Sequence, residues 1–307
     1  MLKPGRQRVL GAEVTRAGLR VALIETDGHA LTGLGPCVSR GLPGGSEAAE
    51  LALAEVCAGF DGVALMGLGE SDLLPPDAAM TLAQALGWPV VSDFASADQR
   101  LGGFGAPLAA FFHHALVRSL GLGGPVAVLD LGDVASLTWC DPRSPSPEEG
   151  CVAFHAGPGL AALTPGALGQ VDAARLSAYA QHAWFRRIPP KVLSGAGPLP
   201  DLHGLGPEDA RATLAAAVAA SVALGFEHFP EAPARLLVAG EGARHGALMA
   251  MLAAGCDCPV EPLPEPEAVP ARALAWLAVR VAMGLPTTGP RTTGVAAPVG
   301  GGTLHRP

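Results

Sequence analysis

Two segments of the chain share one pattern of apolar and polar positions, in which an apolar run leads through a short polar turn into a second apolar run. They are residues 8–26, RVLGAEVTRAGLRVALIET, and residues 125–140, PVAVLDLGDVASLTWC. Two strand-length apolar runs separated by a short turn are typical of a β-hairpin. We therefore expect two hairpins, each of which opens an α/β lobe.

Segments with the period of a helix alternate with short apolar runs after each hairpin. After the first hairpin, the pattern predicts helices near residues 47–58, 76–86 and 107–120 and strands at 62–66 and 89–92. After the second hairpin, it predicts strands at 151–154 and 235–239 and helices near 172–185, 207–229, 243–254 and 268–283. Such alternation is typical of sheets covered by helices, so the predicted fold class is α/β.

The repeated hairpin indicates two related lobes with a cleft between them. The stretch GLGG at residues 121–124 is the expected boundary. It gives an N-terminal lobe of residues 1–121 and a C-terminal lobe of residues 122–307. The tail after Gly284 is rich in Gly, Pro and Thr and has no helical period, so we expect it to pack as a loop.

Composition limits the classes of partner. Of the 307 residues, 49% are hydrophobic and 16% are charged, and the net charge is −8. A nucleic-acid or anionic-membrane partner would require clustered Lys and Arg. Residues 1–14 contain no apolar run of signal-peptide length, and the Ala-rich residues 212–226 are too few to span a bilayer. We therefore expect a cytoplasmic protein with no nucleic-acid or membrane partner.

The six cysteines are scattered, and only Cys256 and Cys258 are close in sequence. A structural zinc site would need a second cysteine pair or histidines at ligand spacing. We therefore predict no metal site on the cysteines and expect reduced, buried thiols.

Residues 91–116, VSDFASADQRLGGFGAPLAAFFHHAL, carry the clearest candidate chemistry. The segment has the pattern of a strand end, a polar loop, a glycine-rich turn and a helix that begins after Pro107. Glycines at 102, 103 and 105 let a backbone bend and approach a ligand closely, because they have no Cβ. Asp93 and Asp98 add hydrogen-bond acceptors, and His113 lies about two turns into the helix. The segment therefore predicts a loop that binds a small molecule.

This string resembles the pattern VSDFRxxDxAxGGQGAPLxPxFH of the anhydro-N-acetylmuramic acid kinase family, although the Arg of the pattern is Ala95 here and its Gln is Phe104. Other matches follow in the family's order. They are Phe154, Gly157, Pro158 and Gly159 with FDTGPGN; Pro189, Pro190 and Lys191 with PPKSTGRE; Val238, Gly240 and Gly242 with VxGGGxxNxxLM; Trp276 and Leu277 with AFAWLA; and Thr293, Gly294 and Pro298 with the family's C-terminal pattern.

The resemblance implies two actin-like, ribonuclease H-like lobes of the actin, Hsp70 and sugar-kinase superfamily. It implies an ATP- and Mg²⁺-dependent enzyme that uses water to open the 1,6-anhydro ring of an amino sugar from cell-wall turnover and phosphorylates the freed 6-oxygen. A homodimer is compatible with it. The implied substrate-binding residues are Asp93, Asp98, Gly103, Gly105, Ala106, Pro107 and His113. The implied nucleotide-binding residues are Thr15, Gly18, Gly132, Gly157, Gly159, Gly240 and Gly242.

Departures from the family pattern fall on the turns that the resemblance assigns to ATP phosphates. In the first turn, the pattern SGTS is replaced by AEVT, which places Glu13 where the pattern has Gly, and Ala17 replaces an Asp. The second turn, NIGGIAN in the pattern, is DLGDVAS at residues 130–136, and the third has Glu241 between its glycines. A carboxylate repels a phosphate at close range, so the acidic residues at these three turns predict weak phosphate binding.

His155 stands where the pattern FDTGPGN has the Asp that the resemblance makes the general base. Histidine can act as a base because its unperturbed pKa is about 6.5. A positioned base contributes about 10²–10⁴ in rate. One hypothesis is therefore a divergent kinase with His155 as its base. The second is a pseudokinase that binds an amino sugar or a protein partner, and we expect weakened or lost activity. A third, another ATPase of the superfamily, would need Glu13 to replace the lost Asp.

Overall fold

The computed structural model describes residues 5–42, 44–195 and 197–307. Part of the N-terminal segment that we judged not to be a signal peptide, residues 1–4, therefore lies outside the described residues. The chain divides into two compact units. Unit 1 comprises Met1–Gly121 and Ala268–Pro307, and unit 2 comprises Leu122–Glu267.

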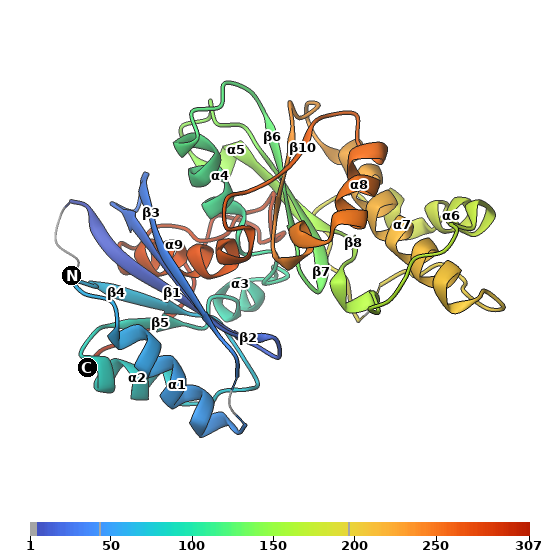
Figure 1. The fold of residues 1–307 in the computed structure, drawn as a ribbon. Coiled ribbons are helices and arrows are strands. Elements are labelled where there is room, and N and C mark those ends of the chain that lie inside the picture. The colour runs from blue at the N-terminus through green and yellow to red at the C-terminus, as the bar shows by residue number, and fades with distance from the viewer. Residues whose placement is uncertain (1–4, 43, 196) are drawn as a thin grey trace. The chain divides into compact units, whose positions relative to one another are not determined.

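Unit 1 is built on a six-stranded sheet with the order β11-β5-β4-β1-β2-β3 (Figure 1). The predicted first hairpin is confirmed, because β1 and β2 pair antiparallel from Gln7↔Thr26 to Thr15↔Gly18. β4 and β5 then add in parallel to β1. The strands are β1 (Gln7–Thr15), β2 (Gly18–Thr26), β3 (Leu31–Arg40), β4 (Leu65–Leu68), β5 (Val90–Ser92) and β11 (Thr303–His305).

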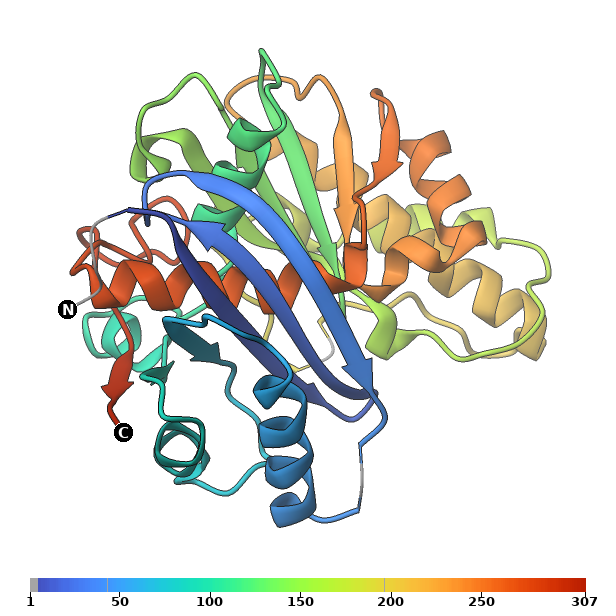
Figure 2. The same ribbon diagram turned by 60° about the vertical axis from the view of Figure 1, so that its left-hand side comes forward.

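Helices cover both faces of this sheet. α1 and α2 pack on one face, where Leu10, Ala12 and Val14 of β1 enter the same apolar cluster as the buried side chains of the two helices. α9 lies across the other face, as Figure 2 shows. The helices are α1 (Ser46–Ala58), α2 (Ala78–Leu86), α3 (Ser96–Arg100), α4 (Ala110–Ser119) and α9 (Val269–Ala282).

Close contact between α9 and the sheet corrects the expected lobe of residues 122–307. A Cβ on Gly11 of β1 would lie 1.7 Å from the carbonyl oxygen of Ala271, and one on Gly67 of β4 would lie 2.1 Å from that of Leu274. Glycine therefore lets the helix backbone rest directly on these strands. This packing assigns Ala268–Pro307 to unit 1.

The tail after Gly284 differs from the expected loop in its last residues. Thr303–His305 forms β11, which pairs antiparallel with β5 at the edge of the sheet. The Nε2 atom of His305 also lies 3.0 Å from Oγ of Ser92. Backbone pairing with an existing strand edge requires no apolar pattern in the added segment, which is why the sequence did not indicate this strand.

Unit 2 repeats the topology of unit 1. Its five-stranded sheet has the order β10-β9-β6-β7-β8, in which an antiparallel meander of three strands is followed by two strands that add in parallel to the first. The second predicted hairpin is therefore also confirmed. The strands are β6 (Val126–Leu131), β7 (Val134–Cys140), β8 (Cys151–Pro158), β9 (Leu236–Ala239) and β10 (Val260–Pro262).

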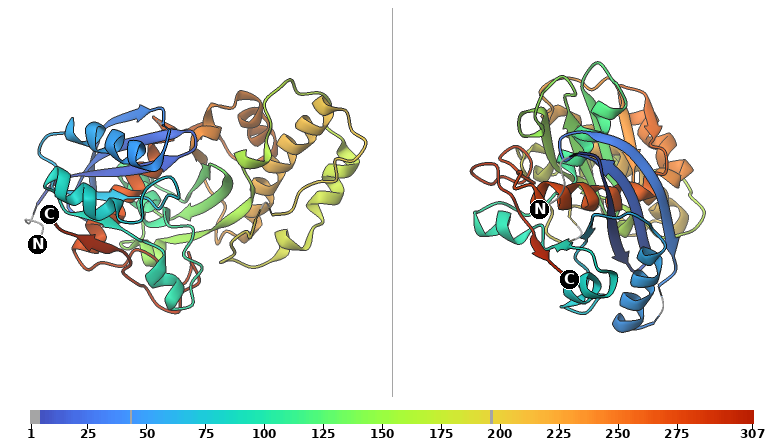
Figure 3. Two further views of the ribbon diagram at one scale, coloured as in Figure 1. Left: turned by 90° about the horizontal axis from the view of Figure 1, so that it is seen from below. Right: turned by 90° about the vertical axis from the view of Figure 1, so that its left-hand side faces the viewer.

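Two helices of unit 2 bury one face of its sheet. Val218 and Val222 of α7 and Leu248 and Leu252 of α8 share an apolar cluster with strand residues such as Phe154. α6 packs beside α7, as Figures 1 and 3 show. The helices are α5 (Pro147–Gly150), α6 (Ala173–Ala180), α7 (Pro207–Gly225) and α8 (Gly246–Gly255).

α7 and the turn that follows it, Pro207–His228, are long and apolar enough to cross a membrane by length and composition alone. Of the apolar window in this segment, 61% is buried inside the protein. A core helix of a globular unit has these same properties, and the cluster with Phe154 gives α7 that role.

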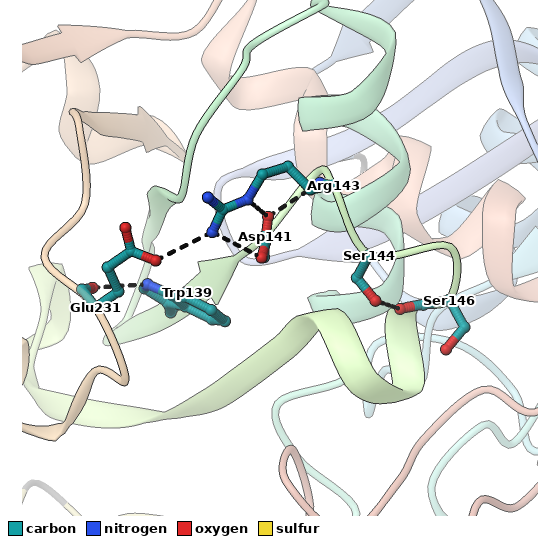
Figure 4. A network of polar contacts seen from close by, with 6 residues as sticks. All are labelled: Trp139, Asp141, Arg143, Ser144, Ser146 and Glu231. Atoms are coloured by element: carbon teal, nitrogen blue, oxygen red, sulfur yellow. Dashed lines mark hydrogen bonds and ion pairs between the residues drawn. The ribbon is translucent and has the colours of Figure 1, made fainter.

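The connection between β7 and β8 is ordered by a polar network (Figure 4). Arg143 bridges two carboxylates, with Nε 2.8 Å from Asp141 and Nη2 3.0 Å from Glu231. The indole N–H of Trp139 donates to the carbonyl oxygen of Glu231 at 2.9 Å. The network holds the β7–β8 connection, at the N-terminal end of β8. His155 lies further along β8 and belongs to the site described below.

Several predicted elements differ from the structure in their bounds. β3 was not predicted, because Gly33, Gly35 and Pro36 weaken the strand pattern and such residues are tolerated mainly at a sheet edge. The predicted helix 172–185 is α6 followed by the separate 3-10 turn Ala183–Arg186. The predicted helix 107–120 begins only at Ala110.

Candidate functional site

The predicted substrate-binding residues all lie in unit 1, between β5 and the middle of α4. Asp98 is the centre of this segment and has no exposed surface. Its Oδ1 accepts a hydrogen bond from the N–H of Gly105 at 2.8 Å, and its Oδ2 accepts from the hydroxyls of Thr288 at 2.6 Å and Thr293. The carboxylate therefore ties the glycine-rich loop to the C-terminal tail and is not presented to a ligand.

The backbone of the glycine-rich loop is also directed inward. The N–H of Gly103 donates to the carbonyl oxygen of Asp98 at 2.9 Å, and the N–H of Phe104 donates to that of Thr293 at 2.8 Å. A Cβ on Gly103 would lie 2.0 Å from Oδ1 of Asp98, so glycine is required for this packing. Gly105 has a φ of 69° and a similarly close neighbour in Gln99. Glycine serves here to hold the loop rather than to offer N–H groups to an anion.

Asp93 and His113 lie on either side of that loop. Asp93 has a φ of 56°, which is unusual for a residue with a Cβ, and its Oδ1 accepts a weak hydrogen bond from the N–H of Ser96 at 3.3 Å. Asp93 is half-buried, so part of the residue is exposed to solvent. Ala106 and Pro107, joined by a cis bond, lead into α4.

His113 of α4 is only 1% exposed. Burial lowers the pKa of His113 to about 3, so its imidazole is neutral in the folded protein at neutral pH. A side chain this buried supports the helix under the loop and does not reach the loop surface.

Sequence reasoning missed the tail threonines that complete this loop. Thr288 and Thr293 are both buried, and they reach Asp98 from 190 and 195 residues away. The signal that could have found them is the run TTGPRTTG at residues 287–294, in which Thr293 and Gly294 match the family pattern but were given no role.

The first predicted nucleotide turn is a tight hairpin in unit 1. The hydroxyl of Thr15 accepts from the N–H of Ala17 at 3.3 Å, and a Cβ on Gly18 would lie 2.6 Å from the carbonyl oxygen of Arg40 in β3. Both residues therefore close the β1–β2 turn and its packing on β3. Glu13 faces Arg20 across the hairpin, with 3.4 Å between Oε2 and Nη1. The acidic charge on this turn is thus compensated within the protein.

The predicted nucleotide glycines of unit 2 also have packing roles. A Cβ on Gly159 would lie 2.3 Å from the carbonyl oxygen of Gly132, and the N–H of Gly159 donates to the backbone carbonyl oxygen of Asp133 at 3.1 Å. The N–H of Gly240 donates to the carbonyl oxygen of Pro266 at 2.8 Å. Two of the N–H groups that a phosphate would need are therefore occupied.

At Gly157 and Gly242, neighbouring side chains likewise occupy the space that a Cβ would need. A Cβ on Gly157 would lie 2.3 Å from Oγ of Ser221 in α7, and one on Gly242 would lie 2.3 Å from Leu131. Gly132 alone of the five has open space around it. Four of the five unit 2 glycines therefore serve close packing around the sheet.

Three of the residues that depart from the family pattern form one row across the sheet of unit 2. Asp130 of β6 pairs with Ser136 of β7, and Ser136 pairs with His155 of β8. The side chains of directly paired residues project from the same face of a sheet, and neighbouring strands lie about 4.8 Å apart. The row lies on the face opposite Phe154, which packs against α7. Burial raises the pKa of Asp130 to about 6.

The imidazole of His155 is held in one tautomer. Its Nδ1 accepts a hydrogen bond from the backbone N–H of Leu193 at 3.1 Å, and the backbone N–H of His155 donates to the carbonyl oxygen of Lys191 at 3.0 Å. Burial lowers the pKa of His155 to about 4, so the ring is neutral at neutral pH. The single ring proton must then be on Nε2, because Nδ1 accepts. The free nitrogen of His155 is therefore a hydrogen-bond donor.

A metal site is not formed by the acidic and imidazole groups of the described residues. No group of three or more His, Cys, Asp or Glu side chains that could hold an ion occurs in the part of the chain that the structure describes. The N–H groups of Gly159 and Gly240 are also already bonded within unit 2, so these two positions do not fit an ATP phosphate. We therefore assign no chemical step to ATP or Mg²⁺.

The two sheets define the class of protein. A three-stranded antiparallel meander followed by two parallel strands occurs in both units, so the chain is a two-unit α/β protein of the ribonuclease H-like class.

Comparison with known sequences then gives the family. The family described as anhydro-N-acetylmuramic acid kinase matches residues 76–194 and 198–306. A relative of that name from Ruegeria sp. (strain TM1040) is 38% identical over 362 positions, which cover 99% of this chain and 96% of the relative. One from Cereibacter sphaeroides is 42% identical over 330 positions, covering 96% of this chain and 86% of the relative. The chain belongs to the anhydro-N-acetylmuramic acid kinase family.

The comparisons also show what this member lacks. The Ruegeria alignment spans 362 positions, whereas this chain has 307 residues, so that relative contains segments that are missing here. The first turn, with Thr15 and Gly18, lies outside the residues that the family description matches. A solved polyphosphate/ATP-glucomannokinase from Arthrobacter sp. strain KM is similar over 90% of this chain and 99% of its own, at 14% identity and a TM-score of 0.46. That likeness is too low for a conclusion about this chain.

Proposed function

We propose that this chain binds the anhydro amino sugar named in its relatives' activity, and that ATP-dependent ring opening and 6-phosphorylation of that sugar are weakened or lost. Membership of the family supports the substrate class. The alternative within this proposal is a pseudokinase without residual turnover, which binds the sugar or a protein partner. A cytoplasmic location and a homodimer stay predictions.

The tautomer of His155 carries the proposal. A general base must present a lone pair to the water that it deprotonates. The Nε2 of His155 carries a proton because Nδ1 accepts from Leu193. To act as a base, the ring would have to shift its proton to Nδ1, which would bring two N–H groups face to face at 3.1 Å. His155 is therefore poorly suited to activate water, and the loss of a base costs about 10²–10⁴ in rate.

Charge in unit 2 supports the same proposal. Asp130 and Asp133 stand in the turn that the family pattern makes uncharged. Glu241 adds a carboxylate beside Gly240, at the third turn. Phosphate-clamp interactions contribute about 10²–10³ in rate when present. Acidic groups at these turns act in the opposite direction, because they repel ATP.

The test is turnover, measured by mass spectrometry with ATP, Mg²⁺ and anhydro-N-acetylmuramic acid. Wild type is compared with His155→Ala, His155→Asp and the double variant Asp130→Asn/His155→Asp, which restores two residues of the family pattern. We expect little or no product from wild type, a small gain in His155→Asp, and a larger gain in the double variant. The larger gain is expected because the new carboxylate at position 155 shares the row with Asp130 in the single variant, whereas the double variant removes the carboxylate at position 130.

Wild-type product at an ordinary kinase rate of about 1–100 per second, abolished in His155→Ala, would contradict the proposal. It would show that His155 changes tautomer and serves as the base. Circular dichroism and thermal melting of every variant separate a loss of folding from a loss of chemistry.

A further inference from the structure

The outward surface of the glycine-rich loop is apolar. Phe104 is 49% exposed and Leu101 is 59% exposed, whereas the loop's N–H groups at 103, 104 and 105 all donate to acceptors inside unit 1. Among the described residues, this loop therefore meets solvent through an aromatic ring and a leucine and not through backbone donors. The family pattern has a Gln where this chain has Phe104.

The loop that carries the ring is rigid on both sides. Asp98 accepts from Gly103 and Gly105, the residues before and after Phe104, and the backbone of Phe104 is bonded to Thr293. An exposed aromatic ring on a braced backbone loses little conformational entropy when a ligand covers it. A ring held in this way is suited to contact a ligand and has no other partner in its own loop.

We propose that Phe104 is a specificity-determining residue, whose ring stacks against the C–H face of the pyranose ring of an amino sugar. This inference rests on the proposed function, because it assumes that the sugar is bound at this loop. Asp93, half-buried at the start of the same loop, supplies an acceptor for a sugar hydroxyl. One aromatic ring with one carboxylate matches the alternation of apolar C–H faces and polar hydroxyls on a monosaccharide.

The size of the apolar surface favours a sugar over a protein partner. A stable protein interface buries about 800 Å² on each side. The exposed half of one phenylalanine side chain is on the order of 100 Å², and Leu101 adds less. Covering that area corresponds to at most about 60-fold in affinity, which suits one pyranose ring.

The test measures binding to anhydro-N-acetylmuramic acid by calorimetry and by proton NMR, with no ATP present. Wild type is compared with Phe104→Gln, Phe104→Ala and Phe104→Trp. Leu120→Ala is the matched control, since Leu120 is also an exposed apolar residue of unit 1 but lies at the end of α4, outside the loop. We expect Phe104→Ala and Phe104→Gln to weaken binding by about 10-fold or more, and Phe104→Trp and Leu120→Ala to bind like wild type.

NMR supplies a signature that a merely structural role would not produce. A stacked ring shifts the sugar's C–H protons upfield through its ring current, and this shift must disappear in Phe104→Gln. Equal affinity in wild type and Phe104→Ala, or no binding of the sugar to wild type, would overturn the inference. A change from dimer to monomer in Phe104→Gln with unchanged sugar affinity would assign the surface to a second copy of the chain and would also overturn it.

Equal sugar affinity in wild type and Phe104→Ala would overturn this inference alone, whereas no sugar binding by wild type would overturn the proposed function as well. Sugar affinity and ring-current shifts decide the role of Phe104 without any turnover. Fast turnover in wild type would contradict the weakened chemistry but would leave the stacking result unchanged.

Discussion

Lys191 offers the sharpest physical test of this structure. Its side chain is 3% exposed, and its Nζ lies 3.3 Å from the carbonyl oxygens of Trp184 and Phe185 and 3.1 Å from Nε2 of His228. No carboxylate of the described residues forms an ion pair with it. Burial, with a smaller contribution from the charge of Arg187, lowers the pKa of Lys191 to about 8.

The hydrogen bonds around His228 agree with that direction. The Nε2 atom of His228 also lies 2.8 Å from the carbonyl oxygen of Phe185, so it must donate a proton to that oxygen. An ammonium group on Lys191 would then direct an N–H toward this N–H, whereas a neutral amine can turn its lone pair toward it and share the proton with the carbonyl oxygen of Phe185. The arrangement therefore favours the uncharged form of Lys191.

The magnitude follows from linkage between protonation and folding. The pKa of Lys191 falls from 10.5 to about 8, and each pKa unit corresponds to about 1.36 kcal/mol. The pKa is lower in the folded state than in the unfolded state. Below pH 8 the folded protein therefore carries the full free-energy cost of a charged, buried Lys191. Stability then rises with pH between 8 and 10.5, and the total gain from this group is about 3 kcal/mol.

The perturbation is Lys191→Met, which keeps the length of the side chain and cannot be charged. Urea unfolding of wild type and variant from pH 7 to 10 gives the difference in free energy of unfolding, in which other titrating groups cancel. We expect the free energy of unfolding of wild type to rise relative to that of the variant by up to about 1.4 kcal/mol per pH unit above pH 8. A difference that is flat across this range would refute the reasoning.

A direct titration checks the same point. Lys3 and Lys191 are the only lysines of the chain, so lysine-labelled protein gives two side-chain NMR signals. One of them must titrate near pH 8 and must be absent from Lys191→Met.

Three further outcomes are expected. Asp98→Ala removes the acceptor of three hydrogen bonds, so it should cost about 3 kcal/mol in urea unfolding and make the glycine-rich loop sensitive to protease; unchanged stability would contradict its bracing role. Gly11→Ala should cost at least about 2 kcal/mol because its Cβ meets Ala271, whereas Gly123→Ala, with open space, should be nearly neutral. Cys140 is buried and its pKa is raised by burial, so native protein should not react at this thiol with a disulfide reagent until it unfolds; rapid native labelling would show that β7 opens.

The parts of the fold that were predictable are those determined by neighbours in sequence. The hairpins at 8–26 and 125–140 each contain both strands and the turn, so the apolar pattern alone indicates them. β3 and β11 were not predictable, since their residues pair with a sheet edge without an apolar pattern of their own. The place of α9 was also hidden, because it depends on the missing side chains of Gly11 and Gly67 in strands far away in sequence.

The candidate site was predictable in its residues but not in their roles. Asp98 was expected to face a substrate, yet it braces the loop, because Thr288 and Thr293 reach it from the far end of the chain. The change at His155 was visible in the sequence. The tautomer that decides its chemistry was not, since it depends on the N–H of Leu193, which approaches β8 from another segment.

The return of the chain to unit 1 has a consequence for the order in which a newly synthesised protein can fold. Unit 2 is one continuous stretch, Leu122–Glu267, and all of its strands are synthesised before α9. Unit 1 still lacks the helix that covers one face of its sheet and the threonines that hold Asp98. Although domains of most chains complete themselves from the N-terminus, here the half that begins first must finish last.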